Sequence, residues 1–258
     1  MSQRLKLLAC EILYREFCAA IARSPNLVDV EFLPKALHDL GQAGMSGRLQ
    51  EAIDGVETDH YDAILLGYGL CSNGVVGLRA AGLPMVVPRA HDCMTLFLGD
   101  RQRYGEYFQA HPDTYFKTPG WIERGEGIEQ FADSSIQKKQ GMVQSYEELV
   151  ERFGEDNASF LWEQLGNMTH NYSRITYIRT GVAPDDRFEA EARRQAEQRG
   201  WQFEALEGDL ALVEQLVDGR WHDESFLVVP PGETIRPSYD QAVVKLEVFP
   251  PDAKAGQD

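Results

Sequence analysis

The sequence predicts an α/β protein made of two Rossmann-like lobes with parallel sheets and a helical middle segment. Short apolar stretches alternate with amphipathic helical patterns in both halves of the chain. Strands separated by helices favour right-handed crossovers, which give a parallel sheet with helices on both faces. The length of 258 residues also suits more than one lobe. We expect an N-terminal Rossmann-like lobe over residues 1–122, a helical connection or lid over 123–172, and a smaller α/β lobe over 173–258.

The first lobe should hold four strands separated by helices. The third apolar stretch opens into a glycine-rich loop, Gly67-Tyr-Gly-Leu-Cys-Ser-Asn-Gly74, and the fourth ends at Arg89-Ala-His-Asp-Cys93. Periodicity and turn residues set the bounds of each element. We expect strands over 5–10, 28–33, 62–67 and 84–88, and helices over 14–22, 46–53 and 75–81.

The middle of the chain looks mainly helical, and the strand–helix alternation then resumes. Asp100 can cap a helix that runs to residue 110, and Ser145 with Glu148 forms a capping-box pattern. The polar, glycine-containing stretch 124–144 suits either a mobile lid or a plain surface insertion. Beyond it we expect strands over 174–178, 201–206 and 226–229, and helices over 185–199 and 210–217.

The composition is that of a folded protein in a reducing compartment. Hydrophobic residues make up 43% of the chain, and 41 acidic against 25 basic side chains give a formal net charge of −16. Nucleic acid and anionic membranes bind clustered lysine and arginine, so we expect neither as a partner. No apolar stretch is long enough for a membrane helix, and four cysteines in so long a chain do not indicate a disulfide scaffold. We therefore expect a cytoplasmic protein.

Residues that can carry chemistry follow three of the expected strands. Cys10 and Glu11 end one strand, Cys71 lies in the loop after another, and His91, Asp92 and Cys93 follow a third. In parallel sheets, ligands bind beyond the carboxyl ends of the strands. We therefore expect these residues to share one site.

Thiolate and imidazole groups together indicate a transition metal, with zinc or iron favoured. Cys10, Cys71, His91 and Cys93 are the candidate ligands. Ligands from separate loops are typical of a catalytic site with an open position more than of a closed structural knuckle. In this interpretation His91 serves as a ligand or as an acid/base, and Asp92 or Glu11 orients a ligand or exchanges protons.

A second interpretation of the same residues is nucleophilic catalysis. Cys71 or Cys93 would be activated by His91, with the expected helix over 75–81 lowering the pKa of the Cys71 thiol. A phosphate cradle in the glycine-rich loop is a third option, although the loop fits neither the dinucleotide nor the Walker spacing. Cys18, His38, His60, His111 and His222 receive no role.

Four further residues are candidates for substrate contact. Tyr68 and Asn73 flank Cys71, and Trp121 ends the stretch Thr118-Pro-Gly-Trp121, which would wall the pocket. Core packing is an equally good explanation for Trp121. Asp209 follows an expected strand, and it is also well placed as a helix N-cap.

Several motifs resemble those of the domain-of-unknown-function family 1638 (DUF1638). They are Ala9-Cys-Glu11, Tyr68-Gly-Leu-Cys-Ser-Asn-Gly74, Pro88-Arg-Ala-His-Asp-Cys93, Thr114-Tyr-Phe-Lys-Thr-Pro-Gly-Trp121, Glu207-Gly-Asp209 and Val228-Val-Pro-Pro-Gly-Glu233. The resemblance implies a link to corrinoid-dependent methyltransferases and therefore to methylated-amine or one-carbon metabolism. A corrinoid protein or a methyltransferase would then be a partner, and a corrinoid could reach the site through it.

The sequence thus leads to a metal-dependent enzyme that acts on a small molecule. The competing hypothesis is a non-catalytic accessory protein that carries a metal, a cofactor or a substrate for a methyltransferase system. Fold cannot separate these two classes, because bilobal α/β proteins serve both.

Overall fold

The computed structural model describes residues 2–71, 73–80, 82–124, 155 and 172–247. Its larger sheet has five strands in the order β2-β1-β3-β4-β8. The first four strands pair in parallel, and β8 pairs antiparallel with β4. The strands are β1 (Arg4–Cys10), β2 (Leu27–Leu33), β3 (Ala63–Gly67), β4 (Met85–Pro88) and β8 (Phe226–Val229).

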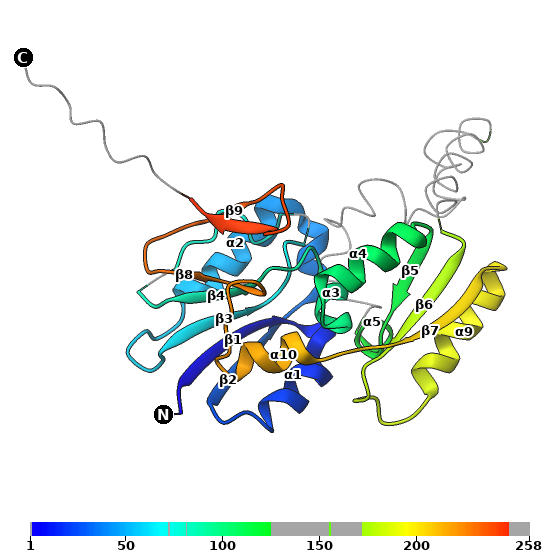
Figure 1. Ribbon diagram of the computed structural model, residues 1–258, viewed down its shortest axis with the longest axis horizontal. Coiled ribbons are helices and arrows are strands. Elements are labelled where there is room, and N and C mark those ends of the chain that lie inside the picture. The colour runs from blue at the N-terminus through cyan, green and yellow to red at the C-terminus, as the bar shows by residue number, and fades with distance from the viewer. Residues whose placement is uncertain (1, 72, 81, 125–154, 156–171, 248–258) are drawn as a thin grey trace, which may run out of the picture.

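Both faces of this sheet are covered by helices. All residues of β3 and β4 are buried, as expected for apolar strands in the middle of a parallel sheet. The crossovers around β1 run in opposite directions, so α1 (Tyr14–Ile21) and α2 (Gly41–Asp54) lie on opposite faces (Figure 1). The helix α10 (Ala211–Val217) packs beside α1 and against β3 and β4.

The smaller sheet contains three parallel strands in the order β5-β6-β7. They are β5 (Thr114–Lys117), β6 (Arg174–Arg179) and β7 (Gln202–Glu207). The helix α9 (Arg187–Arg199) joins β6 to β7 and buries Phe188, Ala192 and Ala196 against Ile175 and Tyr177. This second core is small, and most buried residues belong to the larger sheet.

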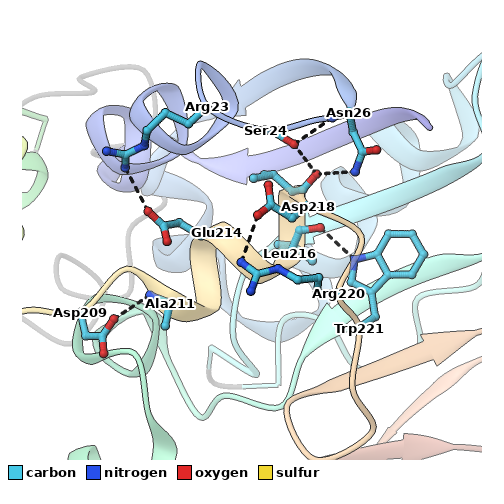
Figure 2. Close-up of polar contacts among 11 residues, drawn as sticks. Arg23, Ser24, Asn26, Asp209, Ala211, Glu214, Leu216, Asp218, Arg220 and Trp221 are labelled. Carbon is cyan, nitrogen blue, oxygen red and sulfur yellow. Dashed lines mark hydrogen bonds and ion pairs between the residues drawn. The ribbon is translucent and has the colours of Figure 1, made fainter. Parts of the chain in front are cut away.

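Each half of the chain contributes to both sheets. The strand β5 precedes residue 122 but lies in the smaller sheet, whereas β8 and α10 follow residue 173 and lie on the larger sheet. Figure 2 shows how α10 is held there. Ser24 and Asn26 donate side-chain hydrogen bonds of 2.9 and 3.0 Å to the carbonyl oxygen of Val217, and Trp221 Nε1 donates to that of Leu216. The expected division into lobes stays a prediction, but strand pairing crosses its boundaries.

The α/β fold class with parallel sheets is confirmed, and most expected elements are present. The expected helix over 75–81 is wrong. Residues 75–77 form a turn and Arg79 pairs with Thr234 in an isolated β-bridge, because this stretch bonds to a distant segment: Gly77 N donates to Ile235 O, and Ile235 N donates to Leu78 O. The sequence analysis also missed β5 and two short strands, which are β9 (Ile235–Pro237) and β10 (Val244–Leu246).

Among the described residues, three further helices lie between β4 and β6 along the chain. Asp100 caps α4 (Arg101–Ala110) by accepting a 2.8 Å hydrogen bond from Arg103 N, as expected. The other helices are α3 (Cys93–Leu98) and α5 (Pro119–Glu123), and two 3-10 turns, η1 (Glu11–Leu13) and η2 (Lys35–Leu40), follow β1 and β2. The expected capping box at residues 145 and 148 lies outside the described residues, as does the expected lid beyond residue 124. None of the helices that the structure describes has the length and apolar content needed to cross a bilayer.

A buried carboxyl group lies between α1 and the loop that follows β6. Glu16 is fully buried, and its Oε1 accepts a 2.7 Å hydrogen bond from the hydroxyl of Thr180. Its Oε2 has no partner in the described part of the chain. Burial raises the pKa of Glu16 from 4.5 to about 7, although the Thr180 bond opposes this shift. Glu16 is therefore largely protonated below neutral pH.

We predict that Glu16 makes the protein less stable as the pH rises from about 5 to 8. The unfolded chain releases this proton near pH 4.5, whereas the folded chain holds it to about pH 7, so folding becomes less favourable across that window. The shift corresponds to about 3 kcal/mol. Glu16→Gln should flatten this part of the pH profile, measured by urea unfolding. Glu51→Gln, which changes an exposed carboxylate of α2, is the control and should leave the profile unchanged. An identical pH slope in wild type and Glu16→Gln would contradict the prediction.

Candidate functional site

The candidate site lies where the order of the strands reverses. Successive connections leave β1 toward β2 on one side and return to β3 on the other, which opens a crevice at the carboxyl ends of β1 and β3. Cys10 is the last residue of β1, and Ala9 lies beside Gly67 at the end of β3. The loop that carries Cys71 therefore starts next to Cys10.

The loops after β3 and β4 are bonded to one another through their backbones. Leu70 N donates to Ala90 O at 2.7 Å, and Cys71 N donates to His91 O at 2.9 Å. The approach is so close that a Cβ atom on Gly69 would lie 2.8 Å from the backbone of Asp92. Cys71 itself has a φ of 47°, a conformation that a residue with a side chain seldom adopts. These contacts fix Cys71 beside the start of α3, where Cys93 lies.

The three cysteines predicted from the strand ends are brought together and buried. Cys10, Cys71 and Cys93 are 1%, 6% and 7% exposed. Burial raises the pKa of Cys10 to about 12, and it also raises those of Cys71 and Cys93. The negative charge of Asp92 raises the pKa of Cys93 further, and charges on Cys71 and Cys10 act in the same direction. All three thiols are protonated at neutral pH.

An imidazole that contacts one of these thiols is that of His38, a residue to which the sequence analysis gave no role. Its Nε2 lies 3.8 Å from Cys10 Sγ, and its ring centre is 6.3 Å from that of Tyr68. Burial and the charge of Lys35 lower the pKa of His38 to about 4, so the ring is neutral. Pro34 ends β2, which places η2 and His38 at the same edge of the sheet as Cys10. The position of His38 shortly after the end of a predicted strand is the sequence signal that could have identified it.

The other predicted acid, base and ligand residues are placed differently. The His91 ring is exposed, and the contact with Cys71 is made by its backbone carbonyl. Asp92 is the N-cap of α3: it accepts from Met94 N at 2.9 Å and from the Tyr104 hydroxyl at 2.7 Å. Glu11 accepts from Lys35 N at 2.9 Å and lies 3.7 Å from Arg124. Both carboxylates therefore already bind groups of the protein.

A cavity of about 610 Å³ lies above the thiols, between the two sheets. His38, Cys71 and Cys93 form part of its surface together with His91 and Asp92 at the loop ends. Six aromatic residues also line it: Tyr104, Phe108, Tyr115, Phe116, Trp121 and Tyr172. This is an open cavity whose lining combines aromatic rings with polar groups, as small-molecule sites do.

The stretch Thr118-Pro-Gly-Trp121 places the indole ring in this wall. Thr118 caps α5 by accepting from Trp121 N at 3.2 Å, and Pro119 occupies the first helical turn. A Cβ atom on Gly120 would lie 1.7 Å from Ile12 O, so only glycine allows α5 to pack this closely on η1. The indole N–H of Trp121 lowers the pKa of Cys93. The geometry between Nε1 and the Cys93 sulfur does not meet that of a hydrogen bond, so Nε1 has no hydrogen-bond partner among the described residues.

The other three predicted substrate contacts, Tyr68, Asn73 and Asp209, do not line this cavity. Tyr68 is buried beneath it, next to the thiols. Asn73 is exposed and has a φ of 67° in a turn. Asp209 accepts from the backbone N of Ala211, the first residue of α10, at 2.8 Å (Figure 2), but Leu210 occupies the N-cap position, so Asp209, the predicted cap, lies one residue before it.

The donor set suits a thiophilic metal, although its side chains are not arranged around a common point. Three thiols and a neutral imidazole are the groups that zinc and iron prefer. In the described residues, no group of three or more His, Cys, Asp or Glu side chains is placed to hold a metal ion. Metal binding would therefore have to draw these side chains together and release their protons.

Comparison with protein families gives one match. The model described as protein of unknown function (DUF1638) matches residues 32–217, more than half of the chain. The chain belongs to the DUF1638 family. The DUF1638 match spans the loops of Cys71 and of His91 to Cys93, the stretch that ends at Trp121, and His38. Neither the curated proteins nor the solved structures contain a match to this DUF1638 chain.

Arg89, in the stretch Pro88-Arg-Ala-His-Asp-Cys93, has a structural role. Arg89 donates from Nε to Asp223 O at 2.7 Å and from Nη1 to Ala242 O at 3.0 Å. A further bond from Nη1 reaches Val244 O in β10. Arg89 thus ties the end of β4 to the C-terminal strands, and this holds the loop of His91 in place.

We predict that Gly69→Ala destabilises this DUF1638 protein by about 1 to 3 kcal/mol, because the new methyl group would overlap the backbone of Asp92. Gly47→Ala in α2 is the matched control. Its methyl group meets open space, and alanine is the better helix former, so stability should rise by about 0.5 to 1 kcal/mol. Urea unfolding measures both. Equal stability of Gly69→Ala and wild type would show that the loops after β3 and β4 are not in close contact.

We also predict slow alkylation of the three clustered thiols in metal-free protein. The pKa of Cys10 rises from 9.0 to about 12, which lowers its thiolate population about a thousandfold. Iodoacetamide at pH 7.5 should therefore modify the half-buried Cys18 first, as followed by peptide mass spectrometry. Faster labelling of Cys71 or Cys93 than of Cys18 would instead support the nucleophile hypothesis.

Proposed function

We propose that this protein is a metal-dependent enzyme that acts on a small molecule in the aromatic cavity. A zinc or iron ion would bind at the floor of the cavity, with Cys10, Cys71 and Cys93 as thiolate ligands. His38 replaces His91 as the imidazole ligand in this proposal. The observation that carries it is the gathering of three buried thiols and a neutral imidazole from separate strand ends beneath one cavity.

The protonation of these groups supports a metal more than a nucleophile. A nucleophilic cysteine needs a lowered thiol pKa, whereas burial raises the pKa of all three thiols. A divalent cation removes this obstacle, because it displaces the thiol protons when it binds. His38 stays neutral to about pH 4, and the neutral form is the one that binds a metal.

The shape of the cavity supports a small organic substrate. Its volume of about 610 Å³ is ordinary for such ligands, and six aromatic residues line it. The exposed His91 remains available at the same cavity as an acid or base. A methylated compound in one-carbon metabolism would suit these walls, and this substrate class, like a corrinoid protein or methyltransferase partner, is a proposal that comes from the family resemblance.

One observation favours the accessory role. Asp92 and Glu11, which the sequence suggested for proton exchange, both bind other groups of the protein through both carboxylate oxygens. A protein that binds metal and ligand but lacks turnover would fit this arrangement. Metal binding is common to both functions, and it is therefore the property to test first.

We predict that protein purified under anaerobic conditions binds Co²⁺, a spectroscopic substitute for zinc, with one ion per chain. Cys71→Ala, Cys93→Ala and His38→Ala should each lose most of this binding, because each removes a ligand. Elemental analysis and absorption titration measure the stoichiometry. Cys18→Ala and His91→Ala are matched controls that leave the proposed ligands intact, and both should bind as wild type does. Substoichiometric metal in wild type, or full binding by all three ligand variants, would disprove the proposal.

A further inference from the structure

Tyr68 carries a buried hydroxyl group that bonds to none of the described residues. The residue is 1% exposed and directly follows β3. Its hydroxyl oxygen has no hydrogen-bond partner anywhere in the described residues. Buried hydroxyl groups nearly always have a partner, because an unpaired one loses its bonds to water without compensation. Phenylalanine would fill the same space without this cost, so core packing does not explain a tyrosine here.

The ring of Tyr68 lies near that of His38, one of the proposed metal ligands. The ring centre of Tyr68 is 6.3 Å from that of His38, and His38 Nε2 is 3.8 Å from Cys10 Sγ. Cys10 and Cys71 are the two neighbours whose charges act most strongly on the hydroxyl group of Tyr68. Because Tyr68 is buried and is not part of the described cavity surface, a substrate in the cavity would not reach it. The groups that we consider as partners of the hydroxyl are therefore the thiols of Cys10 and Cys71.

We propose that Tyr68 is a positioning residue that donates a hydrogen bond to a metal-bound thiolate, that of Cys10 or Cys71. This inference rests on the proposed metal site. A neutral thiol is a weak acceptor, whereas a thiolate accepts strongly, so the bond forms when the metal displaces the thiol proton. Such donors orient a thiolate and draw charge from its sulfur, which changes the affinity and the electronic properties of the metal.

Trp121 repeats this arrangement at the third thiol. Its Nε1 is a donor only, it is buried, and it lacks a partner in the part of the chain that the structure describes. Trp121 and Cys93 both border the cavity. Within the described residues, two buried donors thus lack partners: the hydroxyl group of Tyr68, and Nε1 of Trp121 at the cavity wall.

Tyr68→Phe tests the inference through two effects of opposite direction. The melting temperature of the metal-free protein should rise by about 2 to 4 °C, because a buried unpaired hydroxyl group is removed. The affinity for Co²⁺ should fall by about 10- to 100-fold, because the bound thiolate loses its donor. The sulfur-to-cobalt charge-transfer band should move to longer wavelength, since an unbonded thiolate gives up charge more easily.

Tyr107→Phe is the matched control. The hydroxyl group of Tyr107 is paired, at 2.7 Å from Thr176 Oγ1 and 2.9 Å from Glu204 Oε2. Its removal should lower the melting temperature and leave the affinity and the charge-transfer band unchanged. Trp121→Phe provides a second test at Cys93, and it should lower the affinity and shift the band as Tyr68→Phe does.

The outcomes separate this inference from the proposed function. A wild-type protein that binds no Co²⁺ would disprove both. If wild type binds Co²⁺, then an unchanged affinity and band in Tyr68→Phe and Trp121→Phe would overturn the inference alone. A lower melting temperature of metal-free Tyr68→Phe with no change in the band would show that the hydroxyl group is structural, and this result would also overturn the inference.

Discussion

The position of β1 between β2 and β3 is the constraint on which the site depends. This strand pairs in parallel with β2 on one side and with β3 on the other, so its carboxyl end is flanked by the ends of both neighbours. Right-handed crossovers then place α1 and α2 on opposite faces of the sheet and leave the crevice at this edge uncovered. Cys10, His38 and the loop of Cys71 meet there because of strand order, although 28 residues separate Cys10 from His38 and more separate His38 from Cys71.

The smaller sheet completes the site by supplying a wall. The chain crosses from the larger to the smaller sheet at β5 and α5, and the close packing of Gly120 on η1 holds this crossing against the end of β1. Trp121 and Phe116 therefore face the same cavity as Cys71 and Cys93. On the other side, α10 and β8 return to the larger sheet, where the carbonyl of Val217 is bonded by Ser24 and Asn26. Because the chain passes from one sheet to the other and back, the segments that follow β3 and β4 of the larger sheet contribute Cys71 and Cys93 to the cavity. The strand β5 of the smaller sheet and the helix α5 contribute Phe116 and Trp121.

The sequence was sufficient where a local pattern determines the structure. Apolar strands and the residues that end them predicted Cys10, Cys71 and Cys93 at one edge of the sheet, and the cap at Asp100 followed from its own neighbours. The sequence was insufficient where contacts with distant segments determine the local structure. Residues 75–80 look helical in isolation but bond to the chain around Ile235, and no local pattern predicts that β8 adds to β4 in the antiparallel direction. His38 was missed because it lies in a 3-10 turn without apolar periodicity, and its role depends on the neighbour of β2.

The buried polar atoms around the thiols argue that the site is not simply core. A protein interior selected for stability alone would have apolar groups where Tyr68 and Trp121 place donors without partners in the described structure. Local departures from the rules of stable packing tend to occur at functional sites, and Cys71 adds a backbone conformation that costs energy for a residue with a side chain. These features occur within the same few loops, beside three protonated thiols and a neutral imidazole. A cation that converts the thiols into acceptors would satisfy both unpaired donors at once, and this shared explanation is the strongest physical reason for the metal site that we propose.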